Sequence, residues 1–513
     1  SEGDVLKDGT VYIAKGGTHL AVKEDHGKVS IYFEDTPPIG GLKPCGNIMY
    51  SSICNLFCYD EIVCVVLTGM GADGTKGIME LSGHKKIHVI AQDEKTSTVY
   101  GMPKAIYESG LTDVVCELNK IAEEITEDAD KVIDATEKFV MPGFIDLHVH
   151  FRDPGLTHKE DIFTGMAAAA HGGFTTVYAM PNTKPVADNA EVINYVHNKA
   201  KEGKCINVYQ VGAITVGQAG AELADIRGMV EAGCPALSED GKSVMNANLY
   251  REAMKIAAEL DIPILAHCED INMVNGGCVN ADAKTKEMGL PGISNSVEDV
   301  IVARDILIAK ETGARLHLCH CSTADSVKMV KAAKEEGLPV SAEVCPHHFV
   351  LTSDDITDPA NTNFKMNPPL RTREDVDALK DGLKAGIMEA ISTDHAPHTA
   401  EEKDTIMQKA PFGIVGSETA ACLTYSELVL GGIYTPLQMA EAMSYNPAKI
   451  MKIDKGDIQP GKVADIVVFD PNAVYKINRH EFVSKGHNTP FHGRKVTGKV
   501  VCTICDGNIV YEA

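Results

Sequence analysis

The sequence predicts an α/β protein with three parts: a partial doubly wound α/β segment, a TIM-type (β/α)8 barrel and a small C-terminal β-domain. Apolar, strand-like runs alternate with amphipathic helical stretches eight times after residue 128, as a barrel of strand–helix units requires. Runs at 461–470 and 498–511 alternate in strand fashion between glycine turns, which is typical of a small β-domain. We expect an α/β segment at 1–127, a junction strand at 128–140, the barrel at 141–445 and the β-domain at 446–513.

Composition excludes several classes of protein. The 513 residues are 44% hydrophobic and 23% charged, an ordinary globular balance. The net charge of −24 argues against non-specific nucleic-acid binding. The 15 Cys lack the paired short spacings of zinc ribbons or secreted scaffolds, which favours a reduced, cytoplasmic compartment. No apolar run reaches about 18 residues, so we expect no membrane partner.

The first segment contains a strand, a glycine-rich turn and a helix. A continuous apolar run at 61–67 leads into the turn at 68–74, and helical residues follow from Ile78. This order resembles a phosphate cradle in outline, but it lacks the glycine spacing of either nucleotide fingerprint. We therefore expect no cofactor in this segment.

The stretches 67–74 (LTGMGADG), 91–94 (AQDE) and 99–103 (VYGMP) resemble the chemotaxis protein-glutamate methylesterase family. That family hydrolyses glutamate methyl esters with a Ser–His–Asp triad, and the resemblance assigns the triad aspartate to Asp73. Ser1 and His19 stand in no matching context. Because a triad without its nucleophile and base loses its nucleophilic route, we expect a truncated, catalytically inactive domain.

The eight barrel strands are read from apolar runs that end at polar residues or turns. Helical stretches such as 249–260 and 324–336 lie between them, with apolar residues recurring at spacings of three and four. Several helices end at a glycine, as Gly313 and Gly337 illustrate. The strands are expected within 140–150, 175–180, 206–211, 235–238, 263–266, 315–318, 340–344 and 389–393.

Histidine and aspartate recur where these strands end, which is the end of a barrel that carries the chemistry. His148 and His150 are alternate residues of the first strand and so share a face. Six of the eight strand ends carry a His or Asp, although the chain has only 19 His. Six ligands exceed one four-coordinate zinc and suit two metals bridged by a carboxylate. The set is His148, His150, Asp240, His267, His320 and Asp394.

From residue 128 onward the chain resembles the bacterial type I dihydroorotases of the amidohydrolase superfamily. The motifs that carry the resemblance lie at 143–155, 180–183, 320–323, 343–348, 365–371, 393–398 and 411–416. This family interconverts (S)-dihydroorotate and N-carbamoyl-L-aspartate in de novo pyrimidine (UMP) biosynthesis. The resemblance implies that the six residues above bind two zinc ions, with Asp240 as the bridge. It assigns substrate contacts to His150, Arg152, Asn182, Asn367 and His398 and to the backbone of Phe412 and Gly413.

These residue types suit the opening of a cyclic amide. A metal lowers the pKa of bound water from 15.7 to about 7, which supplies hydroxide to attack the ring carbonyl. Asp394 is the candidate general base and acid, taking the proton and delivering it to the departing nitrogen. The metals polarise the carbonyl, and Arg152 can bind a substrate carboxylate through two hydrogen bonds.

Three other readings stay open. The barrel resembles hydantoinases and allantoinases in outline, although the motifs at 180–183 and 365–371 favour a dihydroorotase. A metal-free barrel could instead serve as a partner subunit of aspartate transcarbamoylase, and a homodimer is also possible. The third alternative is methylesterase activity of the first segment, which the missing Ser and His weaken.

The junction departs from the dihydroorotase pattern, because the methylesterase-like segment occupies the place of the family's first β-strands. Those strands normally pair with the C-terminal strands. We therefore expect unpaired strand edges and reduced stability or solubility.

Overall fold

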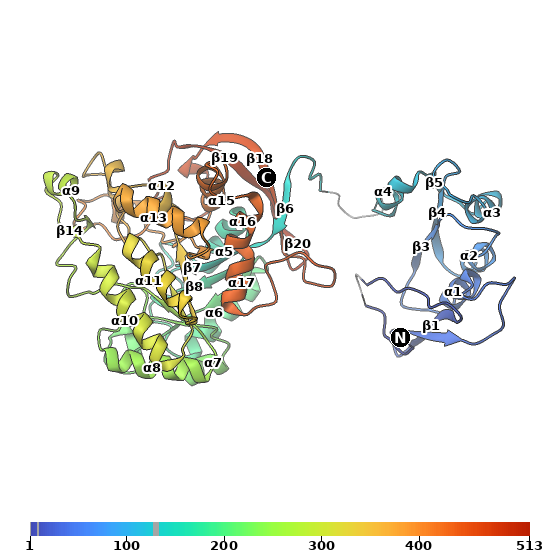
Figure 1. Cartoon of the computed structure of the whole chain (residues 1–513), viewed down its shortest axis with the longest axis horizontal. Coiled ribbons are helices and arrows are strands. Elements are labelled where there is room, and N and C mark those ends of the chain that lie inside the picture. The colour runs from blue at the N-terminus through green and yellow to red at the C-terminus, as the bar shows by residue number, and fades with distance from the viewer. Residues whose placement is uncertain (1, 8–9, 127–132) are drawn as a thin grey trace. The chain divides into compact units, whose positions relative to one another are not determined.

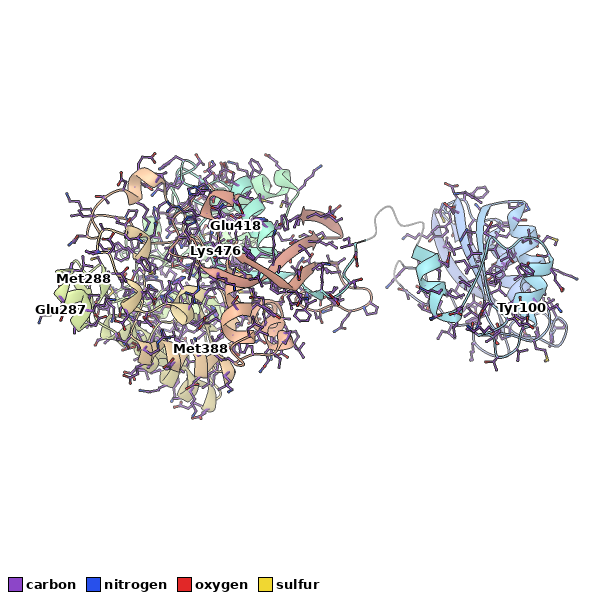
Figure 2. The ribbon with its side chains drawn as sticks, turned by 90° about the horizontal axis from the view of Figure 1, so that it is seen from above. Tyr100, Glu287, Met288, Met388, Glu418 and Lys476 are labelled. Atoms are coloured by element: carbon purple, nitrogen blue, oxygen red, sulfur yellow. The ribbon has the colours of Figure 1, made fainter. Side chains whose placement is uncertain are left out.

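The computed structural model describes residues 2–7, 10–126 and 133–513 (Figure 1). The chain divides into two compact units, Ser1–Asp134 and Ala135–Ala513. Figure 2 shows side chains filling the interior of each, with Tyr100 labelled in the first unit and Met388 in the second. Within the described residues, no helix combines the length and the apolar character that crossing a membrane requires.

The first unit is built on a parallel sheet in the order β3-β4-β5, with a separate antiparallel hairpin of β1 and β2. The apolar residues Cys64 and Val66 of β3 pack against Ile78 and Leu81 of helix α2. The elements are β1 (His19–Asp25), β2 (Lys28–Glu34), α1 (Gly46–Ile53), β3 (Glu61–Val66), α2 (Thr75–Ser82), β4 (Lys86–Gln92), α3 (Met102–Glu108), β5 (Val114–Cys116), the short turn η1 (Leu118–Lys120) and α4 (Ile121–Thr126).

The second unit contains all eight predicted barrel strands, each paired in parallel with its neighbours. One sheet has the order β7-β8-β9 and the other β10-β11-β12-β15-β16-β17. The strands are β7 (Phe144–Val149), β8 (Phe174–Ala179), β9 (Asn207–Gln210) with its continuation β10 (Gly212–Ala213), β11 (Leu237–Ser238), β12 (Ile264–Ala266), β15 (Leu316–Leu318), β16 (Val340–Val344) and β17 (Ala390–Ile391).

The two sheets are linked at both ends. Only Val211 separates β9 from β10, and its backbone N–H donates to Ala179 of β8. At the other end, Val149 of β7 forms a parallel bridge with His395, which follows β17. The pairings therefore lead from β7 round to β17 and back to β7, as the predicted barrel requires.

A helix or helical segment follows each of the eight strands. Their starts are specified locally, since Asp161 before α5 and Thr372 before α13 both form capping boxes. The helices are α5 (Ile162–His171), α6 (Ala190–Gly203), α7 (Ile226–Glu231), α8 (Ala247–Glu259), α10 (Ser296–Thr312), α11 (Ala324–Glu335), α13 (Arg373–Lys384) and α15 (Ala420–Thr424), which continues as η5 (Tyr425–Val429).

Shorter elements decorate this framework. They are η2 (Val216–Gln218), β13 (Val279–Asn280), α9 (Ala283–Glu287), β14 (Gly292–Ile293), α12 (Pro346–Val350), η3 (Ser353–Asp355), η4 (Thr362–Phe364), α14 (Ala400–Lys403), α16 (Pro436–Ala440), η6 (Glu441–Tyr445), α17 (Asn446–Met451) and η7 (Arg479–Glu481).

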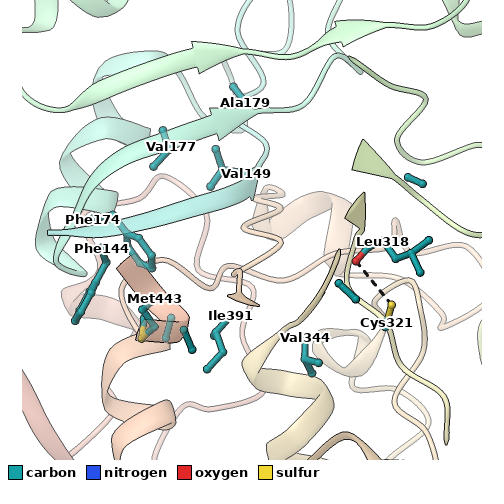
Figure 3. Packing of buried hydrophobic residues seen from close by; sticks show 14 of the residues in the cluster. Phe144, Val149, Phe174, Val177, Ala179, Leu318, Cys321, Val344, Ile391 and Met443 are labelled. Atoms are coloured by element: carbon teal, nitrogen blue, oxygen red, sulfur yellow. Dashed lines mark hydrogen bonds between the residues drawn. The ribbon is translucent and has the colours of Figure 1, made fainter. Parts of the chain in front are cut away.

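The core of the second unit lies against the strands. Figure 3 shows Phe144 and Phe174 next to each other at the start of β7 and β8, with ring centroids 5.8 Å apart in an edge-on arrangement. Ile391 and Met443, from β17 and η6, belong to the same buried cluster. Apolar burial of this kind contributes roughly 25 cal/mol per Å².

The C-terminal β-sheet is antiparallel, in the order β20-β19-β18-β6. Its strands are β6 (Phe139–Pro142), β18 (Ile466–Lys476), β19 (Lys495–Cys505) and β20 (Asn508–Glu512). Glu418, labelled with Lys476 in Figure 2, holds the segment after β18 by accepting from the Val483 backbone N–H at 3.0 Å and pairing with His171 of α5.

This sheet corrects one expectation. Part of the junction, at 128–132, lies outside the described residues. The strand that follows it, β6, pairs with β18 from Pro142↔Ile466 to Phe139↔Phe469. The chain therefore supplies one partner strand for its C-terminal sheet itself, and the sheet is not left without its N-terminal contribution.

Candidate metal centre and substrate pocket

The first pair of predicted ligands lies where β7 meets the rim. His148 is fully buried and His150 is 5% exposed. The outer nitrogen of each ring faces a protein acceptor: His150 Nδ1 donates to Asn182 Oδ1 at 2.9 Å, and His148 Nδ1 lies 3.6 Å from Glu343. The Nε2 atoms of both rings are therefore left facing inward with their lone pairs.

Asp240, which follows β11, lies between two groups of histidines. Its Oδ1 is 3.1 Å from His148 Nε2, 3.5 Å from His267 Nδ1 and 3.7 Å from His320 Nε2. Its Oδ2 is 3.5 Å from His150 Nε2. One carboxylate thus presents an oxygen to each side of the cluster, which is the geometry a bridging ligand needs.

Asp394, after β17, completes the group. Its Oδ1 is 3.1 Å from His150 Nε2 and 3.6 Å from His148 Nε2. Burial opposes its charge, but the hydrogen bond to His150 and the nearby imidazoles keep the pKa of Asp394 below its ordinary value. The structure therefore brings all six predicted ligands together at one rim.

Three residues of the site have left-handed backbones: Arg152 (φ 59°), His320 (φ 35°) and Asp394 (φ 48°). Residues other than glycine adopt this conformation at a cost, of order 1–3 kcal/mol each, and such strain concentrates at functional sites. Sequence patterns contain no signal for a left-handed backbone at these three residues.

The predicted substrate residues divide into two groups. Asn182 and Asn367 face the ligand cluster: Asn182 Nδ2 donates to Asp240 Oδ2 at 3.0 Å, and Asn367 Nδ2 donates to Glu269 at 2.9 Å. Arg152 and His398 lie together, with Arg152 Nη2 3.5 Å from His398 Nε2. Of the predicted residues, Asn182 thus contacts the ligands directly.

The Phe412–Gly413 backbone lies beside His398, whose Nε2 is 2.8 Å from the Phe412 carbonyl oxygen. Gly413 has φ 122°, and a Cβ there would lie 2.6 Å from the Cβ of Ala396. Only glycine fits this close approach, so the loop reaches the pocket as bare backbone.

Three buried carboxylates that sequence reasoning did not assign support the ligands. Glu343 contacts His317 Nε2 at 2.9 Å in addition to His148, Glu269 contacts His267 Nε2 at 3.3 Å, and Asp146 accepts from the His148 backbone N–H at 3.2 Å. Such outer carboxylates set which imidazole nitrogen carries the proton. Asp146 and Glu269 each lie two residues from a predicted ligand, which is the signal the sequence held for them, whereas Glu343 is far from any predicted ligand in the chain.

Comparison with known proteins decides the family. Residues 137–326 match the family described as Dihydro-orotase-like, and residues 429–511 match the Amidohydrolase family. The dihydroorotase of Pelotomaculum thermopropionicum is 48% identical over 382 residues, which are 74% of this chain and 89% of that protein. The chain belongs to the dihydroorotase family. The dihydroorotase of Clostridioides difficile is 47% identical, over 78% of this chain and 95% of its own length.

Solved structures agree on the fold and place this dihydroorotase-family chain among the amidohydrolases. The L-hydantoinase of Arthrobacter aurescens has a TM-score of 0.66 at 28% identity, covering 75% of this chain and 89% of that one. The dihydropyrimidinase of Brevibacillus agri has a TM-score of 0.63 at 24% identity, covering 75% and 88%. Identity to these hydantoinase-type enzymes is lower than to the dihydroorotases, as the motifs at 180–183 and 365–371 led us to expect.

The first unit matches the CheB methylesterase family over residues 1–125. Asp73 accepts hydrogen bonds from the backbone N–H groups of Gly46 and Gly74, at 2.8 and 2.9 Å, and from Cys45 Sγ at 3.0 Å. His19 Nδ1 accepts from the Cys45 N–H at 3.1 Å, and its Nε2 faces the Pro37 carbonyl at 3.4 Å. Asp73 therefore ties together the starts of α1 and α2. Ser1 lies outside the described residues.

The residues of the dihydroorotase-like site fit a bound metal. His148 Nε2, which faces Asp240, is buried and makes no hydrogen bond among the described residues. His267 Nδ1 and His320 Nε2 lie 3.0 Å apart beside Asp240. Buried nitrogen lone pairs around a carboxylate are a cation site in chemical terms.

A supporting carboxylate gives a first testable prediction. Glu269→Gln is expected to weaken metal binding by about tenfold, because carboxylates that hold a ligating imidazole contribute 10–100-fold to affinity. Competition with a chromophoric chelator measures this. Glu336→Gln, which removes an exposed carboxylate paired with Lys310, is the matched control. Equal affinity in both variants would contradict the assignment.

Proposed function

We propose that this chain is a zinc-dependent cyclic amide hydrolase that interconverts (S)-dihydroorotate and N-carbamoyl-L-aspartate in pyrimidine biosynthesis. The observation that carries the proposal is Asp240, whose two oxygens face different histidines within 3.7 Å. The reaction is inferred from relatives named dihydroorotase, which are 43–48% identical to this chain. Six ligands, one of them a bridging carboxylate, suit two zinc ions per chain.

The protein's own groups divide the chemistry between them. Bound metal ions would supply an activated water and polarise the amide carbonyl. Arg152, beside His398, can pair with the substrate carboxylate. Asp394 is ionised and buried, so it can accept a proton from the attacking water and deliver it to the ring nitrogen as the amide bond breaks. The Phe412–Gly413 backbone borders the same pocket.

Asn182 and Asn367 hold the side chains of the ligand cluster in place. Asn182 accepts from His150 Nδ1 and donates to Asp240, so it fixes the orientation of two proposed ligands at once. Asn367 donates to Glu269, which in turn contacts His267. Both amides are therefore proposed to contact substrate from positions already set by the ligand cluster.

Turnover of two substrates tests the proposal. The intact, zinc-loaded chain is expected to hydrolyse dihydroorotate and to act poorly on hydantoin, because only dihydroorotate carries the carboxylate that Arg152 can bind. Faster turnover of hydantoin than of dihydroorotate would favour the hydantoinase alternative. Protein purified without zinc and inactive after zinc addition would favour the non-enzymatic subunit.

For the first unit we propose no catalytic function. The carboxylate of Asp73 is engaged by two helix starts, and no contact joins it to the His19 ring among the described residues. Glutamate methyl esters are expected to remain intact with the full chain. Ester hydrolysis that Asp73→Ala abolishes would contradict this proposal.

Several finer points stay predictions: the cytoplasmic location, a homodimer or an association with aspartate transcarbamoylase, and the barrel and β-domain limits at 141–445 and 446–513. Sedimentation of the chain, alone and mixed with the transcarbamoylase, tests the two assemblies.

A further inference from the structure

A partly buried ion pair, Lys159 with Glu402, lies behind His398, on the side away from the Phe412 carbonyl. Lys159 Nζ is 3.3 Å from His398 Nδ1 and 2.9 Å from Glu402 Oε1. Glu402 Oε2 is also 3.3 Å from His398 Nδ1. The Lys159 side chain is 14% exposed and that of His398 6%. Neither sequence motif nor ligand pattern singles out Lys159.

The contacts define where the protons of His398 lie. The Phe412 carbonyl can only accept, so His398 Nε2, at 2.8 Å, carries a proton. In a neutral ring Nδ1 must then accept, and the ammonium of Lys159 is the donor within reach. Glu402 cannot donate, and it is held near Nδ1 by its own ion pair with Lys159.

The charges around the ring favour this neutral form. Burial is the largest effect, and the cations of Arg152, Lys159 and Lys403 add to it, so the pKa of His398 lies below its ordinary value. Glu402 is the one opposing charge in contact with the ring among the described residues. His398 therefore stays uncharged near neutral pH.

We propose that Lys159 is a positioning residue that locks His398 in the form with its proton on Nε2, so that this N–H faces the substrate pocket beside Arg152. The inference rests on the proposed function. Without Lys159, the proton can move to Nδ1 and bind Glu402. The lone pair of Nε2 would then face the Phe412 carbonyl oxygen. That contact would be repulsive and would displace the backbone that borders the substrate pocket.

Lys403 holds the loop that carries Phe412 through contacts that do not involve Lys159. Its Nζ donates to the carbonyl oxygens of Pro411 at 2.8 Å and of Thr362 and Lys365 at 3.3 Å. The loop is thus anchored independently of Lys159, so loss of Lys159 should alter the proton on His398 without releasing the loop.

The test is the pH dependence of KM for dihydroorotate in Lys159→Met. At neutral pH, KM is expected to rise about fivefold, the size of one lost hydrogen bond between neutral groups, while kcat changes less. Removing the Lys159 cation lets the pKa of His398 rise. Acidification then protonates both ring nitrogens, restores the Nε2–H donor and brings KM back toward the wild-type value.

Two control variants distinguish a changed proton position on His398 from structural damage. Lys159→Arg keeps a charged donor and should retain the wild-type KM. Lys310→Met removes an exposed ion pair with Glu336 by the same substitution and should change neither KM nor its pH dependence. If Lys159→Met does not fold, as its melting curve would show, Lys159→Gln is measured in the same way.

Two results overturn the inference: an unchanged KM at neutral pH, or a raised KM that does not recover in acid. Both require active wild-type enzyme. Absence of dihydroorotate turnover in the wild type would instead contradict the proposed function itself, so the two failures are distinguishable.

Discussion

Replacing Asp394 with asparagine is expected to lower kcat for dihydroorotate by about 10³-fold, since a positioned general acid–base contributes 10²–10⁴-fold. Asparagine keeps the shape and one oxygen but cannot hold the transferred proton. The effect should fall on kcat, because the carboxylate contacts His148 and His150 and, among the described residues, no other predicted substrate-binding group. Steady-state assays on the zinc-loaded variant measure it.

Metal content and melting temperature accompany this assay. Asp394 is also a proposed ligand, so the variant is assayed at saturating zinc, and its metal content is measured in the same sample. A zinc-replete Asp394→Asn protein that retains kcat within tenfold of the wild type would exclude Asp394 as the group that moves the proton.

Asp240→Ala is expected to have the largest effect on the metal centre. The substitution removes both oxygens that face the two histidine groups. Asp394 still faces His148 and His150, but the anion that reaches all four imidazoles is lost. Loss of an outer carboxylate lowers metal affinity 10–100-fold. Loss of the bridging ligand should therefore lower the affinity for zinc by about 10³-fold or more. We expect at most one zinc per chain and turnover near background.

Asp261→Ala is the matched control, because Asp261 is 63% exposed and pairs with Lys452 at the surface. It should retain the full metal content and activity. Two tightly bound zinc ions in Asp240→Ala would show that the carboxylate does not bridge them.

The sequence predicted the strands and the convergence of the candidate ligands for one physical reason. Parallel barrel strands are buried on both faces, so β7 and β8 read as apolar runs, and the residues after such runs must meet at one rim. His148, Asp240 and Asp394 could therefore be grouped although they lie far apart in the chain.

The supporting residues could not be found in this way. Lys159 lies in a loop before α5, away from every strand end. Glu343 is the second-last residue of β16, but the residues that follow that strand gave no ligand to group it with. Their roles depend on side-chain orientation across elements, and on the left-handed backbones of Arg152 and Asp394, which no spacing rule contains.

The pairing of β6 with the C-terminal sheet was not predicted, for a related reason, and the expected loss of stability or solubility stays a prediction. The residues of β6 read as the start of the first barrel strand, and their pairing with β18 depends on register between segments far apart in sequence. Hydrophobic pattern specifies which face of a strand is buried, but it does not identify the neighbour at the strand's edge.

The central claim is that one carboxylate holds a pair of cations among four imidazoles at the barrel rim. Elemental analysis of the intact chain, coupled to its dihydroorotate hydrolysis rate during zinc titration of metal-stripped protein, tests it most directly. The structure predicts activity that rises with zinc and saturates at two equivalents per chain. Full turnover in metal-stripped protein, or two bound equivalents with no turnover, would contradict it.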